Sequence, residues 1–154
     1  MNEQRLLESI RLHEGYRSEA YRDHLGNWTI GYGHLLEDEP LRQFMPLGSV
    51  GALLSKLTAR ATHDAWLVED VQTALQDAER WLGFAFANLS DIRQEVVVEM
   101  AFQLGYTRLS GFVKLRVAIM DGEWEEARTQ MLDSLWARQV PGRAHELADK
   151  FRAG

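Results

Sequence analysis

The spacing of apolar residues changes along this chain, and this change limits the folds that the chain can adopt. Residues 3–14 carry apolar side chains in steps of three and four, which is typical of an amphipathic helix. Between residues 20 and 36 the period becomes two, and the turn sequence Leu25-Gly26-Asn27 indicates a small antiparallel sheet of three short strands. After Pro40 the helical period returns. We therefore expect an α+β fold with a small sheet lobe and a larger helical lobe.

Capping residues predict where the helices begin and end. Asn2 is suited to cap the first helix and Gly15 to end it. A long helix over residues 62–82, capped by Thr62, would join the two lobes. We interpret residues 1–154 as a single domain, with the sheet lobe at about 14–61 and the helical lobe at about 82–154 plus the N-terminal helix. Further helices are expected at 50–60, 90–104 (capped by Ser90), 111–120, 124–138 and 141–151 (with Pro141 in its first turn).

The composition excludes several classes of function. The 154 residues include 17 Lys and Arg against 23 Asp and Glu, a net charge of −6, and the bases form no stripe, so nucleic acid is not an expected partner. The absence of cysteine excludes a thiolate zinc site and a cysteine nucleophile, and the histidines share no spacing typical of metal ligands. The apolar runs fall far short of the ~20 residues that span a bilayer, so membrane insertion is not expected. The N-terminus has acids where a signal peptide has bases, so no signal peptide is expected.

Three polar residues in the first forty positions carry the candidate chemistry. Glu14, Asp23 and Thr29 follow the pattern Glu-x8-Asp-x5-Thr, one on the helix, one beside the turn and one on a strand. Two carboxyl groups on separate elements can act as acid and base in the cleavage of a glycosidic bond. Glu14 is the candidate acid because the end of a helix and a packed face both favour a protonated carboxyl. Asp23, beside a solvated turn, is the candidate base. From spacing alone, a surface glutamate and a turn-forming aspartate remain the alternative interpretation.

Longer stretches of sequence connect this pattern to a known family. Residues 12–17 (Leu-His-Glu-Gly-Tyr-Arg), 20–23 (Ala-Tyr-Arg-Asp) and 28–36 (Trp-Thr-Ile-Gly-Tyr-Gly-His-Leu-Leu) closely resemble the phage-type lysozymes, or endolysins, of glycoside hydrolase family 24. Later stretches at 101–105, 110–112, 141–144 and 151–154 are also similar, whereas residues 37–61 match poorly. The resemblance implies a lysozyme-like fold and a muramidase that hydrolyses the β-1,4 bond between N-acetylmuramic acid and N-acetylglucosamine in peptidoglycan.

The resemblance also implies roles for individual residues. Glu14 would be the general acid, and Asp23 with Thr29 would direct a water molecule that inverts the anomeric centre. His34 and Asp70 would form a supporting pair between the sheet and the long helix. The implied substrate-binding residues are Gln103, Arg143, Leu35 and Phe102. No metal and no cofactor are expected.

The expected partner is peptidoglycan, bound by a monomer made in the host cytoplasm and acting on the cell wall in the periplasm after release. A role in host cell lysis follows from the resemblance, while a virion-borne enzyme or a bacterial effector remains open. A lytic transglycosylase is one alternative, and it would have no need of Asp23 and Thr29. A non-catalytic peptidoglycan-binding module is the other, and it would need none of the three residues.

Overall fold

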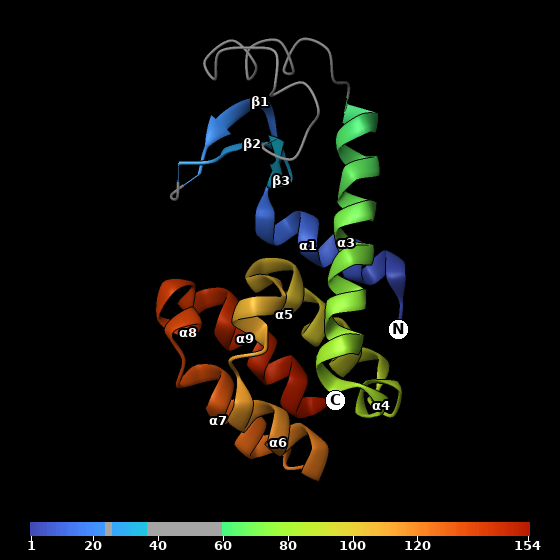
Figure 1. Ribbon diagram of the computed structural model, residues 1–154, viewed down its shortest axis with the longest axis vertical. Helices are drawn as coiled ribbons and strands as arrows, with labels where there is room; N and C mark the ends of the chain where they lie inside the picture. Colours follow the sequence, from blue (N-terminus) through green and yellow to red (C-terminus); the bar gives the residue numbers. More distant parts are fainter. Residues whose placement is uncertain (24–25, 37–59) are drawn as a thin grey trace. The chain divides into compact units, whose positions relative to one another are not determined.

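The computed structural model describes residues 1–23, 26–36 and 60–154 (Figure 1). The predicted helix at 50–60 and much of the predicted sheet lobe after residue 36 lie outside these described residues. The chain divides into two compact units, the sheet unit (Leu7–Asp70) and the helical unit (Met1–Leu6 with Val71–Gly154). Helices and a small antiparallel sheet make up the described residues, so the predicted α+β class is confirmed.

The sheet unit contains three antiparallel strands in the order β1 (Arg17–Arg22), β2 (Trp28–Gly31) and β3 (His34–Leu35) (Figure 1). Thr29 on β2 pairs with Tyr21 on one side and with Leu35 on the other. The first strand begins at Arg17, three residues before the predicted start of the sheet. The register is irregular between Arg17 and Tyr21, so this part of the strand shows no regular alternation that a period of two could detect.

A small apolar core lies against this sheet. Ile30 and Leu36 are fully buried, and Ala20, Trp28 and Trp66 pack against them. Trp66 comes from helix α3 (Arg60–Leu82), so this helix covers the sheet core with its first turns.

The ends of the first two helices depend on different contacts. Helix α1 (Glu3–Glu14) is capped as predicted, because the Asn2 side-chain oxygen accepts a hydrogen bond from the Arg5 amide at 3.0 Å. Gly15 has φ +67° and ends the helix. For α3 the predicted cap is wrong, because the helix begins at Arg60 and Thr62 lies inside it. Tertiary contacts of Arg60, described below, hold the first turn of this helix.

The helical unit is built around its last helix. Helix α9 (Pro141–Ala153) packs against α5 (Asp91–Leu109), α7 (Trp124–Leu132) and α8 (Leu135–Gln139), while α6 (Val113–Asp121) packs against α7 (Figure 1). Leu147, Ala148 and Phe151 on α9 are buried in this core. Pro141 begins α9 as predicted, and the predicted cap Ser90 accepts a hydrogen bond from the Arg93 amide at 3.3 Å.

Three predictions for this unit are wrong in detail. The single helix expected at 124–138 is interrupted at Asp133, and Ser134 then caps α8 by accepting a hydrogen bond from the Ala137 amide at 3.0 Å. Helix α5 continues past residue 104 to Leu109 through a non-helical Gly105 (φ 67°, ψ 164°), and α6 begins at Val113 instead of at residue 111. The short helix α4 (Phe84–Ala87) carried no periodic signal, because four residues are too few for one.

Candidate active site

The carboxyl group of Glu14 lies at the junction of α1 and the sheet. Glu14 is the last residue of α1 and is half-buried. Gly15 then turns the chain with a positive φ, its amide donating to the Arg11 carbonyl at 3.1 Å. A Cβ built on Gly33 would lie 3.9 Å from Glu14 Oε2, so the carboxyl group lies against the glycine-flanked turn between β2 and β3.

Asp23 is held by hydrogen bonds across the β1–β2 turn. Its Oδ1 accepts from the Asn27 amide at 2.8 Å, and its Oδ2 lies 3.4 Å from the Asn27 side-chain nitrogen. The Asp23 amide donates in turn to the Asn27 carbonyl at 2.9 Å. These hydrogen bonds fix the orientation of the Asp23 carboxyl group at the turn.

Thr29 is almost completely buried, with 3% of its surface exposed. Its hydroxyl donates to the Asn27 carbonyl at 3.3 Å. Asn27 therefore binds both Asp23 and Thr29, and this connects the two residues expected to direct water. The sequence identified Asn27 only as part of a turn, because turn residues give no sign of which side chains they will bind.

Tyr21 lies on β1 of the sheet unit, and several charged groups affect its pKa. Burial raises the pKa of Tyr21, the Arg17 guanidinium opposes this shift, and the carboxylates of Glu14 and Asp23 both raise the pKa further. Arg17 lies over the ring, with its guanidinium carbon 4.1 Å from the ring centroid. Tyr21 also pairs with Thr29 across β1 and β2.

The proposed supporting pair forms a close contact between β3 and the middle of α3. His34 Nδ1 lies 2.9 Å from Asp70 Oδ2, and the His34 ring stacks on Trp66 with centroids 4.6 Å apart. The two contacts join β3 to α3 within the sheet unit.

The candidate substrate-binding residues are distributed over both units. Leu35 belongs to β3 of the sheet unit and is 40% exposed. Phe102 and Gln103 lie on α5, and Arg143 lies in the first turn of α9; all three are half-buried. Gln103 Oε1 accepts a hydrogen bond from Trp136 Nε1 at 2.6 Å. Among residues 1–23, 26–36 and 60–154, the structure shows no acceptor for the two N–H donors of the Gln103 amide.

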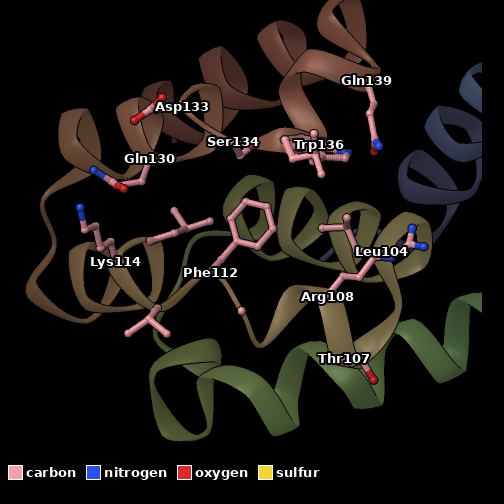
Figure 2. Close-up of a pocket in the computed structure, with 14 residues that line it drawn as sticks. Leu104, Thr107, Arg108, Phe112, Lys114, Gln130, Asp133, Ser134, Trp136 and Gln139 are labelled. Carbon is pink, nitrogen blue, oxygen red and sulfur yellow. The ribbon is translucent and has the colours of Figure 1, made fainter.

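A cavity of about 680 Å³ opens beside Trp136 in the helical unit (Figure 2). Figure 2 shows Phe112 and Trp136 in its wall together with Lys114 and Gln130. Leu104, the neighbour of Gln103, also lines it, but Phe102, Gln103 and Arg143 do not. A mixture of aromatic, amide and charged groups of this kind suits an amphipathic ligand such as a sugar or a peptide. Trp136 is buried, lines this cavity and binds Gln103.

Two further properties concern membranes and metals. Over residues 1–23, 26–36 and 60–154, no helix combines the length and the apolar character that crossing a membrane requires. Within the same ranges, no three His, Asp or Glu side chains gather in a way that could hold a metal ion.

The sequence is similar to a family model and to several known proteins. The family model described as phage lysozyme matches residues 11–148. The chain is 31% identical over 152 residues to the pre-baseplate central spike protein Gp5 of Enterobacteria phage T4, covering 90% of this chain and 26% of that protein. It is 27% identical over 161 residues to the probable T4-type lysozyme 2 of Dictyostelium discoideum, covering 97% and 94%.

A third relative is the peptidoglycan hydrolase gp36 of Pseudomonas phage phiKMV, which is 30% identical over 131 residues, covering 85% of this chain and 13% of that protein. The chain therefore spans almost all of the Dictyostelium protein but only about a quarter of Gp5 and a smaller part of gp36.

Proposed function

We propose that this chain, which belongs to the phage lysozyme family, is a muramidase. Membership of the family makes it a lysozyme-type glycoside hydrolase with a lysozyme-like fold. Its substrate would be the β-1,4 bond between N-acetylmuramic acid and N-acetylglucosamine in peptidoglycan. The observation that carries this proposal is the geometry of the sheet unit, where the Glu14 carboxyl lies against the turn between β2 and β3 and where Asp23 and Thr29 both bind Asn27. The similarity to a protein named as a peptidoglycan hydrolase supports the substrate.

In the proposed mechanism Glu14 is the general acid. Its carboxyl proton passes to the glycosidic oxygen as the bond from that oxygen to C1 of the muramic acid breaks. The position of the Glu14 carboxyl at the end of α1, against the turn between β2 and β3, supports this role. Glu14 then regains a proton from solvent.

Asp23 and Thr29 would act on the water molecule. As the water oxygen bonds to C1 from the opposite face, Asp23 accepts the proton that the water loses, so the reaction inverts the anomeric centre. The Thr29 hydroxyl donates its own proton to the Asn27 carbonyl, which leaves the lone pairs of its oxygen to accept a hydrogen bond from this water.

Substrate binding would involve Gln103, Arg143, Leu35 and Phe102. The Trp136 indole holds the Gln103 oxygen, so the amide nitrogen can donate to a carbonyl oxygen of the glycan or its peptide. The cavity beside Trp136 supports binding of the same polymer by the helical unit. We further propose that residues 1–154 form one catalytic domain, that the protein acts as a monomer on the cell wall, and that it serves in host cell lysis.

The experiment that tests this function is digestion of purified peptidoglycan by the wild type and by Glu14→Gln, with mass analysis of the released fragments. The substitution preserves shape and removes the proton donor. Glu8→Gln, at an exposed glutamate on the same helix, is the matched control. We expect fragments with reducing muramic ends from the wild type and Glu8→Gln, and almost none from Glu14→Gln.

Other products would identify the alternatives. Fragments with 1,6-anhydro ends would refute hydrolysis in favour of a lytic transglycosylase. No release by a wild type that binds peptidoglycan would refute catalysis and leave a binding module. Full activity of Glu14→Gln would refute the assignment of the acid.

A further inference from the structure

Tyr16 connects the end of α1 to the sheet and is held from several directions. Only Gly15 separates it from Glu14. Its hydroxyl lies 3.0 Å from His63 Nδ1, and its ring centroid lies 5.2 Å from that of Tyr32. The guanidinium carbon of Arg60 lies 4.5 Å from the same Tyr16 centroid. A residue held in this way limits the movement of the Glu14 backbone beside it.

The turn that carries Tyr32 is also the turn that the Glu14 carboxyl contacts. Tyr32 is buried between Gly31 and Gly33, and its hydroxyl oxygen accepts a hydrogen bond from Arg60 Nη2 at 3.2 Å. The Cβ position of Gly33 is the one that lies 3.9 Å from Glu14 Oε2. Tyr16, Tyr32, Arg60 and His63, which we call the Tyr16 brace, therefore join α3 to the segment after α1 and to the turn that the Glu14 carboxyl contacts.

His63 is a buried polar member of the Tyr16 brace and has no part in the proposed mechanism. It is 2% exposed, and a Cβ on Gly31 would lie only 3.0 Å from its own Cβ. Its ring also stacks on Trp66, with centroids 5.6 Å apart. Burial lowers the pKa of His63, which favours a neutral ring with one donor and one acceptor nitrogen. A buried polar side chain with a specific tyrosine partner is suited to fix a position.

We propose that Tyr16 and His63 are positioning residues for the general acid, and that their hydrogen bond holds the Glu14 carboxyl at the turn between β2 and β3. The inference rests on the proposed function. Misplacement of a catalytic group by a fraction of an ångström lowers the rate of the chemical step more than it lowers binding. Loss of the hydrogen bond should therefore lower kcat and leave KM almost unchanged.

The test compares Tyr16→Phe with wild type on soluble peptidoglycan fragments. Tyr106→Phe is the control, because none of the described residues forms a hydrogen bond with the Tyr106 hydroxyl. The Arg80 guanidinium carbon lies 3.9 Å from the centroid of the Tyr106 ring, which the substitution preserves. Both variants are assayed at a temperature where circular dichroism shows each to be fully folded. We expect Tyr16→Phe to lower kcat by about 3- to 10-fold, the equivalent of one hydrogen bond, with KM within about twofold of wild type. Tyr106→Phe should match wild type.

Two substitutions of His63 test whether an alternative hydrogen bond to Tyr16 preserves kcat. Asn places an amide near the position of Nδ1 and can still bond with Tyr16, whereas Leu cannot. We expect kcat of His63→Asn to exceed that of His63→Leu and approach wild type. In the Tyr16→Phe background, His63→Asn and His63→Leu should give similar kcat values.

The outcomes separate the two proposals. If wild type releases no reducing ends, the proposed function fails and this inference fails with it. If wild type is active and fully folded Tyr16→Phe has the same kcat, only the positioning role is refuted, even if Tyr16→Phe melts at a lower temperature. That last result would assign the Tyr16 brace to stability alone.

Discussion

Gly31→Ala tests the close packing of α3 against β2. Gly31 has φ +67°, and a Cβ there would lie 3.0 Å from His63 Cβ and 3.2 Å from His63 Cγ. The left-handed conformation costs an alanine about 1–2 kcal/mol, and overpacking of a buried site adds about 1–3 kcal/mol. We therefore expect the free energy of unfolding to fall by about 3 kcal/mol, which for a chain of this size corresponds to a drop in Tm of about 6–12 °C.

A matched control isolates the contact from the backbone strain. Gly15 has the same φ of +67°, but a Cβ there would have no neighbour within 4 Å. In Gly15→Ala the free energy of unfolding should therefore fall only by the cost of the left-handed backbone conformation, about 1–2 kcal/mol. Urea unfolding of both variants, followed by circular dichroism, measures the difference directly. Equal losses in the two variants would refute the tight contact between Gly31 and His63.

Three further predictions concern pH, helix capping and substrate binding. Burial lowers the pKa of His63 below its ordinary 6.5, so at a pH just below 6.5 the unfolded chain binds a proton that the folded chain does not. The free energy of unfolding should therefore fall as the pH drops through about 6.5. Urea titrations between about pH 8 and pH 5 should show a weaker pH dependence for His63→Asn than for wild type. Ser134→Ala removes the cap that accepts from the Ala137 amide and should cost about 1 kcal/mol, lowering Tm by about 2–4 °C; an unchanged Tm would contradict it. Trp136→Phe removes the donor that holds Gln103, so KM for peptidoglycan fragments should rise by about 3- to 10-fold, and an unchanged KM would argue against substrate binding by Gln103.

Local signals in the sequence predicted much of the fold. The Asn2 and Ser90 caps, the ending of α1 at Gly15 and the first turn of α9 at Pro141 each depend on residues close in sequence. The errors occurred where distant contacts decide. Arg60, the first residue of α3, contacts Tyr16 and Tyr32, and no pattern within the helix could indicate these contacts. The break between α7 and α8 lies in an otherwise continuous helical pattern, and a single serine marks it.

The candidate site was predictable to a similar degree. Glu14, Asp23 and Thr29 could be selected because their spacing matches a family pattern and because each lies on an element with a clear local signal. Asn27 and Tyr21 could not be selected, since Tyr21 meets Thr29 only through the pairing of β1 with β2, and Asn27 matters through its hydrogen bonds with Asp23 and Thr29. The Tyr16 brace depends on packing between segments 47 residues apart, which periodicity does not report.

The anomeric form of the first product tests the central proposal most directly. In the proposed mechanism Glu14 protonates the leaving oxygen while Asp23 and Thr29 direct water to the opposite face, so cleavage of a β-linkage must first release the α-anomer at the reducing muramic acid. Proton NMR of a fresh digest, recorded before mutarotation, distinguishes the anomers. We expect wild type to release the α-anomer first and Glu14→Gln to release almost no product. A first product with the β-anomer, or with a 1,6-anhydro end, would contradict it.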